Sequence, residues 1–513
     1  MNDEQNEIWN NIKDDLALPL EIDYSKLENQ LNQFINWRNN KGLGFLEAVT
    51  GYGKTFVAII AIKRMNLNRP NYNTIVIVPN TSLLNDWIDP NQGYIVSHNL
   101  LNVRVYVVNT FTMSDVDRNS HLLVLDEGHR YSNEESKFFS TVLDSTNFIY
   151  CLILSGSLED EQKEFLIKRS INQIGEVTQQ EAEYNGWVSK FKMYNIPITL
   201  DEEHLEKLSK IDDTINNTFK KFNFNFGLAM ACSKGKNVPS WVTYKKGERG
   251  KKMTSYEWRS YHARQCGWRG EENHTWHPKK IQQYAGLWQK MLQERQKLLF
   301  NYYEKITLAK DILEKLNEQS IVFSESIEFV KALKSILPES EEYHSKLPTY
   351  IYKTNKQKEV VAESCDIKGK YRYKDGRALT RQQIRALHPN MKLVSGKKRQ
   401  ELIKQQFKEG MFKYLLTVHA LDEGYNNKNV VVGLTASAKS TKRVRVQRDG
   451  RIIRKSGDKL AILINLYCAG TQEEKWLASR QRGIPKSKIE TVTDINEITK
   501  ELKYDETEIK IEE

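Results

Sequence analysis

An α/β fold with two tandem units, each a parallel β-sheet flanked by helices, is predicted by three features of the sequence. Short apolar runs alternate with helical segments near the N-terminus, and the same alternation returns in the C-terminal half. Apolar strands without polar alternation are typical of parallel sheets that are covered on both faces. The length of 513 residues allows about two to four domains, and the 39% of hydrophobic residues can fill their cores.

The first unit is expected to begin with the apolar run 44–49, which ends in a glycine-containing loop, and the helix 55–65. Further strands are expected at 74–78, 103–108, 122–125 and 149–154, and a further helix at 82–87. Pro79 closes the strand 74–78, because proline cannot donate a hydrogen bond to a sheet ladder.

The second unit follows a helical stretch, 281–316. Its expected strands are 320–323, 414–417, 430–434 and 461–466, and its expected helices are 327–337 and 398–407. Two segments fit neither unit and are interpreted as insertions, at about 222–278 and 348–394. The predicted organisation is a first lobe over 1–221, an insertion and helical connector over 222–304, a second lobe over 305–484 and an acidic tail over 485–513.

The charge of the chain permits a polyanionic partner without requiring one. The net charge is +11 and the isoelectric point about 9.0, which is mild for this length. Basic residues concentrate in 234–280 and 346–399. No apolar stretch approaches the roughly eighteen residues of a membrane-spanning helix. The polar and acidic residues 1–10 do not resemble a signal peptide.

The cysteines are few and scattered, at positions 151, 232, 266, 365 and 468. This pattern indicates reduced thiols and a cytoplasmic protein. A zinc site could be drawn from Cys232, Cys266, His274 and His277. The CxxC spacing typical of such sites is absent, so separate roles are favoured for these residues.

The strongest local motif is a glycine-rich loop between a strand and a helix. It reads Ala48-Val49-Thr50-Gly51-Tyr52-Gly53-Lys54-Thr55. Gly51 and Gly53 let the backbone turn its N–H groups toward phosphates, and the N-terminus of the following helix adds positive potential. Lys54 is expected to reach the β- and γ-phosphates of ATP, and the Thr55 hydroxyl to bind Mg²⁺. A chance glycine turn is the alternative, which the strand–loop–helix context disfavours.

A pair of carboxylates follows the apolar strand 122–125. Asp126, at the carboxyl end of this strand, is the expected Mg²⁺ ligand. Glu127 is the expected catalytic base, which orients and deprotonates the attacking water. Alone, the tetrapeptide 126–129 would be weak evidence of a catalytic site. Its position directly after a buried strand makes it specific evidence.

Together these motifs resemble those of the DEAD/DEAH-type superfamily 2 helicases, with the loop in the form A-x-x-G-x-G-K-T and the acidic pair in D-E-G-H. The resemblance covers both predicted units, about two thirds of the chain. It implies two RecA-like lobes that use ATP and Mg²⁺. It also implies that Gln30, seven residues before Trp37, reads the adenine base; a solvated helical glutamine is the alternative.

In the first lobe, the resemblance implies that Pro79, Asn80 and Thr81 contact the nucleic-acid backbone. Ser155 and Ser157 occupy the place of the family's S-A-T element, which couples hydrolysis to movement along nucleic acid. Gly156 stands there for the usual alanine.

In the second lobe, the segment 417–426 resembles the element that senses both ATP and nucleic acid. Thr417 is implied to contact nucleic acid and Gly424 to contact the nucleotide. His419 and Asn426 stand where many relatives have Asp, which puts contacts at these two positions in doubt.

The segment 447–454 matches the pattern Q-R-x-G-R-x-x-R. Arg451 and Arg454 are three residues apart and therefore share one side of a helix. The resemblance implies that they act as arginine fingers on the γ-phosphate and that Gln447 belongs to the same catalytic set. A solvated basic face is the alternative.

The first insertion interleaves aromatic and basic residues, which is the composition of an accessory grip on nucleic acid. Trp241 is expected to stack on bases, and four lysines to meet phosphates: Lys245, Lys246, Lys251 and Lys252. A small helical subdomain whose aromatics fill its own core is an equal alternative. For the second insertion, a solvated charged surface is favoured.

A closer likeness is to phage helicases of the UvsW kind and XPB-like DNA motors, carried by 155–158, 429–457 and 471–476. It implies an ATP-dependent DNA helicase or translocase, a monomeric motor without a membrane, that remodels duplex or branched DNA in replication, repair or recombination. Alternatives are an RNA helicase and the motor subunit of a restriction or defence complex. A non-catalytic scaffold is disfavoured by the presence of Lys54, Glu127 and Arg451 together.

Overall fold

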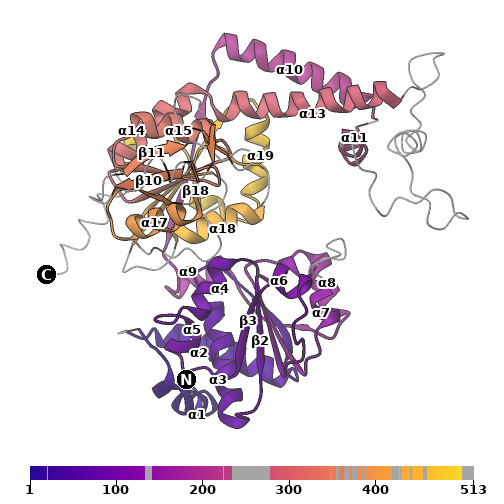
Figure 1. Cartoon of the computed structure of the whole chain (residues 1–513), viewed down its shortest axis with the longest axis vertical. Coiled ribbons are helices and arrows are strands. Elements are labelled where there is room, and N and C mark those ends of the chain that lie inside the picture. The colour runs from indigo at the N-terminus through magenta and orange to yellow at the C-terminus, as the bar shows by residue number, and fades with distance from the viewer. Residues whose placement is uncertain are drawn as a thin grey trace, which may run out of the picture. The chain divides into compact units, whose positions relative to one another are not determined.

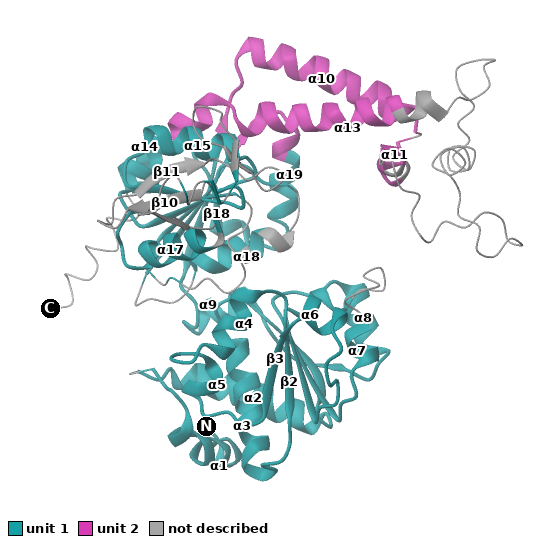
Figure 2. Cartoon of the chain, in the orientation of Figure 1, with its two compact units in different colours: residues 1–196, 309–466, 475–513 teal, residues 197–308, 467–474 magenta. Residues whose placement is uncertain are grey.

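The chain divides into two compact units (Figure 2). Unit 1 comprises residues 1–196, 309–466 and 475–513, and unit 2 comprises 197–308 and 467–474. The computed structural model describes residues 1–19, 21–132, 141–222, 224–233, 278–347, 349–353, 358–362, 370–372, 378–380, 382–383, 386, 391–394, 396–418, 427, 429–439, 442–453 and 459–499.

The first sheet of unit 1 has the strand order β3-β2-β4-β5-β1-β6, with parallel pairing throughout. Its strands are β1 (Leu43–Ala48), β2 (Thr74–Val78), β3 (Val103–Val107), β4 (Leu122–Asp126), β5 (Tyr150–Ser155) and β6 (Asn172–Val177). The helices are α1 (Asp3–Ile12), α2 (Tyr24–Asn39), α3 (Lys54–Asn68), α4 (Thr81–Ile88), α5 (Tyr94–Ser97), α6 (Val108–Met113), α7 (Thr141–Ser145), α8 (Asp160–Ile167) and α9 (Gln179–Tyr184).

Helices cover both faces of this sheet, as Figure 1 shows around β2 and β3. On β1, Leu46 packs in a cluster with Val57 of α3, whereas Phe45 packs in a second cluster with Phe111 of α6 and Phe165 of α8. Successive side chains of a strand point to opposite faces. Burial on both faces explains why these strands are continuously apolar in sequence.

The second sheet has the order β18-β7-β17-β16-β8-β15-β9. Its strands are β7 (Phe191–Ile198), β8 (Ser320–Ser324), β9 (Ser340–Tyr343), β15 (Tyr414–Val418), β16 (Val432–Thr435), β17 (Ala461–Cys468) and β18 (Ile489–Thr491). The helices next to them in sequence are α14 (Tyr303–Leu316), α15 (Ile327–Ile336), α17 (Gly396–Lys408), α18 (Lys442–Ile452) and α19 (Gln472–Arg480). Two parallel sheets flanked by helices confirm the expected α/β fold class with two RecA-like lobes.

β7 lies in the second sheet although its residues precede 221, the expected end of the first lobe. It pairs in parallel with β18, where Met193 is the partner of Ile489. Strand patterning identifies a strand but not the sheet that it joins, because pairing partners can be far apart in sequence. The expected tail 485–513 likewise begins with residues that belong to this sheet. The other domain boundaries stay predictions.

The second insertion contains two small antiparallel sheets. One has the order β11-β10-β14 and the other pairs β12 with β13. The strands are β10 (Thr349–Lys353), β11 (Lys358–Ala362), β12 (Lys370–Arg372), β13 (Ala378–Thr380) and β14 (Met391–Val394). The segment is therefore a β-structured insertion between β9 and α17.

Unit 2 is built on two long helices, α10 (Glu202–Lys220) and α13 (Pro278–Phe300), with the shorter α11 (Phe226–Ser233) beside α13 (Figure 2). They enclose a small core of their own, in which Phe219 stacks on Trp288 at a ring distance of 5.2 Å. Cys232 is buried in this core. The described flanks of the first insertion thus form a helical subdomain. Residues 234–277, which carry Trp241 and the four lysines, lie outside the described residues.

A buried ion pair stabilises the base of unit 2. Lys305 Nζ lies 2.7 and 2.5 Å from the two carboxylate oxygens of Glu473, and the side chains are 0% and 4% exposed. Glu473 also accepts a hydrogen bond from the backbone N–H of Cys468 at 2.8 Å. Removing one partner of such a pair costs about 3–5 kcal/mol, so this contact firmly joins the start of α14 to the start of α19.

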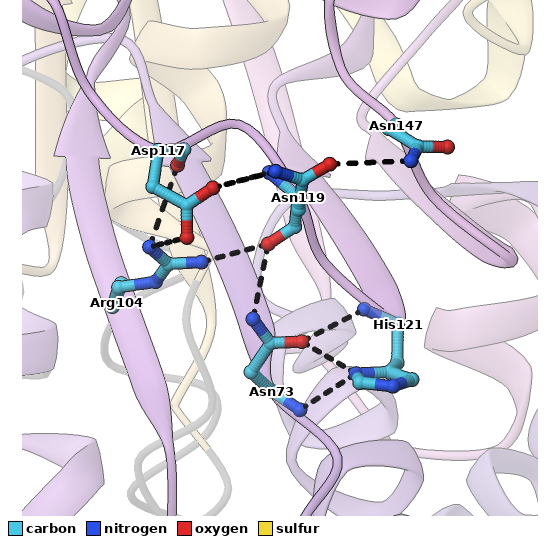
Figure 3. A network of polar contacts seen from close by, with 6 residues as sticks. All are labelled: Asn73, Arg104, Asp117, Asn119, His121 and Asn147. Atoms are coloured by element: carbon cyan, nitrogen blue, oxygen red, sulfur yellow. Dashed lines mark hydrogen bonds and ion pairs between the residues drawn. The ribbon is translucent and has the colours of Figure 1, made fainter.

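The amino-terminal ends of the first sheet carry a polar network (Figure 3). Arg104 of β3 bonds the Asp117 carboxylate at 2.8 Å and the carbonyl oxygen of Asn119 at 2.7 Å. The backbone N–H of Asn73 donates to His121 Nδ1, and the N–H of His121 donates to the Asn73 side-chain oxygen, both at 3.1 Å. The network joins the segments that lead into β2 and β4.

Among the residues that the structure describes, no helix combines the length and the apolar character needed to cross a membrane.

Candidate nucleotide-binding site

The glycine-rich loop connects β1 to α3, as the sequence predicts. Gly51 and Gly53 have φ angles of 94° and 91°, a region that residues with a side chain rarely adopt. Gly53 is the N-cap of α3, so the loop ends at the positive end of a helix. The Lys54 ammonium bonds the Ala48 carbonyl oxygen at 2.8 Å, which keeps its charge within the loop.

One face of α2 holds the loop in place. Gln30 Nε2 donates to the carbonyl oxygens of Tyr52 and Gly53, both at 3.2 Å. Lys26 Nζ donates to the carbonyl oxygen of Gly51 at 3.1 Å, and the Tyr52 hydroxyl donates to Asn29 Oδ1 at 2.6 Å. Sequence reasoning singled out Gln30 alone. The spacing 26, 29, 30, which places all three on one helix face, was the signal that could have identified Lys26 and Asn29.

Tyr52 is fully buried inside the loop. Burial, and secondarily the Glu181 carboxylate, raise the pKa of its phenol, so the hydroxyl stays protonated and remains the donor to Asn29. Its ring also packs on Trp187 at 5.7 Å. Trp187 Nε1 donates to the Ser25 hydroxyl at 3.2 Å, which links the loop to the start of α2.

The acidic pair lies at the carboxyl end of β4. Asp126 is the last residue of β4 and is 5% exposed. Glu127 has φ 58° and ψ 55°, a left-handed conformation that is uncommon outside glycine. Its backbone N–H donates to Asp126 Oδ1 at 3.0 Å, and its carboxylate lies 3.4 Å from His129 Nδ1.

Gly128 allows this turn to lie against β5. A Cβ atom on Gly128 would lie 2.3 Å from a methyl carbon of Ile153, so only glycine fits here without displacement. The next residue, His129, accepts a hydrogen bond from Gln162 of α8 through its backbone oxygen at 2.8 Å. The turn that presents Glu127 is therefore held from two sides.

The Ser155–Ser157 segment lies beside the loop. A Cβ atom on Gly156 would be 3.7 Å from the Thr50 hydroxyl oxygen and 3.9 Å from Lys54 Nζ. The Ser155 hydroxyl donates to the Ser157 carbonyl oxygen at 3.1 Å. This segment contacts Thr50 and Lys54, which are expected at the phosphates of ATP. It can therefore shift when the phosphates bind or leave.

The segment with the arginine-finger pattern forms α18 and also reaches the loop. A Cβ atom on Gly450 would lie 2.4 Å from the Cβ atom of Thr50. Arg451, the next residue, is 5% exposed. The structure thus brings α18, far away in sequence, to the glycine-rich loop. Arg454, Gly424 and the side chain of Gln447 lie outside the described residues.

Sequence reasoning missed a buried contact that anchors α18. Arg448 Nη2 lies 2.6 Å from the Glu325 carboxylate after β8, and its guanidinium carbon is 5.4 Å from the centre of the Phe323 ring. Arg448 is 2% exposed. Burial lowers the pKa of its guanidinium, which Glu325 opposes. Since Glu325 belongs to no motif, its pairing with Arg448 could not be read from the sequence.

The expected nucleic-acid residues of the lobes lie on different elements. Asn80, between Pro79 and Thr81, is the N-cap of α4, and its side-chain oxygen accepts hydrogen bonds from the N–H groups of Ser82 and Leu83 at 2.9 and 3.0 Å. This explains why a short polar residue follows the strand here. Thr417 is buried in β15.

The residues expected to hold Mg²⁺ supply oxygen donors, which Mg²⁺ prefers. Thr55 is in the first turn of α3 after β1, and Asp126 ends β4. β1 and β4 both pair in parallel with β5, so their carboxyl ends share one sheet edge. Across the described ranges, no group of three or more His, Cys, Asp and Glu residues forms another metal site.

The chain is similar to a family model, a curated relative and a solved structure. A family model described as "Type III restriction enzyme, res subunit" matches residues 1–160. The DNA 3'-5' translocase XPB2 of Sulfurisphaera tokodaii is 22% identical over 491 residues, which cover 93% of this chain and 89% of that protein. The solved helicase domain of Pyrococcus furiosus Hef aligns with a TM-score of 0.46 at 14% identity, over 88% of this chain and 97% of that chain. The family model and the curated relative confirm the resemblance to superfamily 2 helicases with an XPB-like character.

Proposed function

We propose that this protein is a nucleic-acid-dependent ATPase of the superfamily 2 helicase type, which translocates along DNA and unwinds or remodels duplex or branched DNA. The observation that carries the proposal is the contact between Gly450 of α18 and Thr50 of the glycine-rich loop. Because Arg451 is the next residue of α18, this contact supports a role for Arg451 at the loop that contains Lys54. The XPB2 relative, which is named a DNA translocase, supports DNA as the polymer.

In this mechanism, ATP binds with its phosphates at the N-terminus of α3. Lys54 leaves the Ala48 carbonyl oxygen and neutralises the β- and γ-phosphates. Thr55 and Asp126 hold Mg²⁺, which supplies charge neutralisation at the phosphates when bound. Glu127, presented by its strained turn, orients and deprotonates the water. Arg451, together with Arg454 and Gln447, stabilises the charge that develops on the γ-phosphate, and Gln30 and Gly424 complete the nucleotide contacts.

Hydrolysis is coupled to movement through the segment 155–157. Gly156 lies close to both Thr50 and Lys54, so a change at the γ-phosphate reaches Ser155 and Ser157 directly. Ser157, with Pro79, Asn80 and Thr81, holds the nucleic-acid backbone in the proposal. Ser155 and Thr417 are fully buried and support their own segments without contacting the polymer. Contacts with the nucleic-acid backbone give strongly salt-dependent and weakly sequence-specific binding. Trp241 and the lysines of the first insertion extend this grip.

A second function is favoured by the match of residues 1–160 to the restriction-enzyme family model. The same motor could be the ATPase subunit of a restriction or defence complex, with the nuclease on another chain. A monomeric motor, a cytoplasmic location and a role in phage replication, repair or recombination belong to the leading proposal and rest on sequence alone. A further alternative is an RNA helicase, in which the same motor acts on RNA instead of DNA.

The test is ATP hydrolysis by the purified protein and its Glu127→Gln variant with single-stranded DNA, forked DNA or matched RNA. We expect hydrolysis that forked DNA stimulates and that the variant lacks. Stimulation by RNA alone would overturn the DNA assignment and keep the motor. Stimulation that requires added nuclease or recognition subunits would favour the restriction-complex function. No ATPase activity under any of these conditions would overturn the proposal.

A further inference from the structure

A small cavity lined mostly by polar and charged residues lies in the second lobe, on the side of α18 that carries Arg445, Arg448 and Asp449. Its volume is about 80 Å³, well below the roughly 300 Å³ of pockets that take drug-sized ligands. It is large enough for a few water molecules or one small ion. A nucleotide or a nucleic-acid base does not fit it.

The cavity is formed where parallel strands end, which is a common place for ligand sites in open α/β sheets. Glu325 follows β8, and Thr435 ends β16. β8 and β16 are neighbours in the sheet. From β8 the chain passes to β9 and β15 on one side, and then to β16 and β17 on the other. The cavity therefore opens at the point where the strand order reverses.

Positive charge exceeds negative charge around this cavity. Its lining includes four cationic side chains, Lys439, Arg445, Arg448 and Arg480, and two carboxylates, Glu325 and Asp449. Four positive and two negative charges leave an excess of two. Glu325 pairs directly with Arg448 at 2.6 Å, which removes one charge of each sign from this balance.

Arg445 is poorly matched by its own carboxylate. Its Nη1 atom is 3.8 Å from Asp449 Oδ2, beyond hydrogen-bond distance. Its buried Nε has no hydrogen-bond partner among the described residues. Burial raises the pKa of the Asp449 carboxyl to about 6, against the influence of Arg445, Arg480 and Arg448. A protonated Asp449 can donate a hydrogen bond instead of repelling an anion.

We propose that this cavity binds one tetrahedral oxyanion of the phosphate or sulfate type. Arg445 and Arg480 would supply charge-assisted hydrogen bonds to the anion. The Thr435 hydroxyl adds a neutral donor. Lys439, an exposed residue that follows β16, adds a further positive charge. Thr435, Asn465 and Arg480 are each less than 9% exposed, which favours a free anion over a phosphate of a polymer. The inference does not depend on the polymer that the motor uses.

Occupancy of the cavity bears on the expected finger, because Arg445, Arg448 and Arg451 are on the same helix at intervals of three residues. An anion that bridges α18 to α19 would restrain α18 beside Arg448, and would thereby stiffen the helix whose Gly450 approaches Thr50. This consequence rests on the proposed function: if the protein hydrolyses ATP, the site would let the inorganic phosphate product influence the motor.

The test is calorimetric titration of the full chain with sodium sulfate, against sodium chloride at equal ionic strength. Sulfate is chosen because it does not titrate between pH 5.5 and 7.5. We expect saturable binding to the wild type that tightens as the pH falls through about 6, where Asp449 gains its proton beside Glu325, Lys439 and the three arginines. Asp449→Asn should bind at pH 7.5 about as tightly as the wild type at pH 5.5.

Arg445→Gln should weaken sulfate binding about tenfold or more, and Arg445→Lys should recover part of the loss. Lys408→Gln, an exposed position in α17, is the matched control and should bind as the wild type does. Circular dichroism melting of each variant separates lost binding from lost folding. The proposal is wrong if sulfate has no more effect than chloride, or if folded Arg445→Gln binds it normally.

Two sources of the anion are distinguished by repeating the titration with saturating single-stranded oligonucleotide. Undiminished sulfate binding identifies a free anion as the ligand. Competition, together with a smaller salt dependence of oligonucleotide binding by Arg445→Gln, identifies a backbone phosphate of the polymer. Both results leave the oxyanion site in place, and both are independent of whether ATP is hydrolysed.

Discussion

The two edges of the first sheet are both rich in polar residues, yet they are built differently. At the amino-terminal edge, Arg104 pairs with Asp117, and the Asn73 side chain donates to the Asn119 carbonyl oxygen (Figure 3). Left-handed residues occur at this edge too, at Lys41 and Asn102. At the carboxyl-terminal edge, Glu127 stands in a left-handed conformation, and two loop glycines have positive φ angles. Polar side chains therefore do not by themselves identify a site.

The difference lies in what the side chains serve. The amino-terminal network joins loops to loops, and the Asp117 carboxylate is held by the N–H of Asn119 at 3.0 Å and by Arg104. At the other edge, side chains of α2 bond backbone carbonyl oxygens of the loop. These contacts fix the backbone shape of the loop. What separates the two edges is therefore the segment that the side chains bond, and not the polar density or a left-handed backbone, which both edges contain.

The largest expected effect comes from replacing one acid at each edge of the first sheet, Glu127 and Asp117. Glu127→Gln should lower the rate constant of ATP hydrolysis by about 10²–10⁴-fold, since it removes the general base, while ATP still binds. Asp117→Asn, at the other edge, should leave the rate unchanged. Steady-state hydrolysis and nucleotide-binding titrations of both variants check this. An equal loss in both would mean that the carboxyl-terminal edge is not the site.

Gly450→Val tests the approach of α18 to the loop. A Cβ atom at 2.4 Å from that of Thr50 must displace α18, and a displacement of about 1 Å can cost about 10²-fold in rate. ATP hydrolysis should fall much more than ATP binding. Gly286→Ala is the control, because a Cβ atom there meets nothing within 4 Å in α13. Valine and alanine both have a higher helix propensity than glycine. A loss of activity in Gly450→Val alone would therefore be due to the lost contact with Thr50.

Lys26→Met tests whether α2 shapes the loop. The bond from its ammonium to the Gly51 carbonyl oxygen involves a charged donor, and such bonds contribute about 1.5–3 kcal/mol. We expect the KM for ATP to rise about tenfold. Arg104→Met removes a cation with similar bonds at the amino-terminal edge and should not change the KM. If both variants keep a normal KM, Lys26 is only a surface contact.

The smallest expected effect is a pH-dependent change in the free energy of unfolding, caused by Asp117 at the amino-terminal edge. The N–H of Asn119, and next Arg104, lower the pKa of the Asp117 carboxyl from 3.8 to about 2. A lowered folded-state pKa gives stability above the unfolded value, which is lost as the pH falls from about 4 toward 2. Asp117→Asn should thus lower the free energy of unfolding slightly at pH 7, with a difference that shrinks in acid. Urea titrations at pH 7 and pH 2.5 measure it.

Much of the first lobe could be predicted from the sequence because its signals are local. The strand–loop–helix from β1 to α3, and the acidic pair after β4, depend on residues that are neighbours in the chain. The expected strands 74–78 and 122–125 were predicted from their continuous apolar residues, which the burial of both sheet faces explains. The identity of most candidate catalytic residues follows from the same local patterns.

Contacts between distant segments were decided only by the tertiary structure. Strand periodicity could not assign β7 to the second sheet, since a strand carries no mark of its partner. Glu325 became the partner of Arg448 across 123 residues, and Thr50 met Gly450 only when α18 packed near the loop. The sequence determines which chemical groups are present and their local conformation. Folding determines which of them meet, because long-range contacts depend on the packing of whole elements.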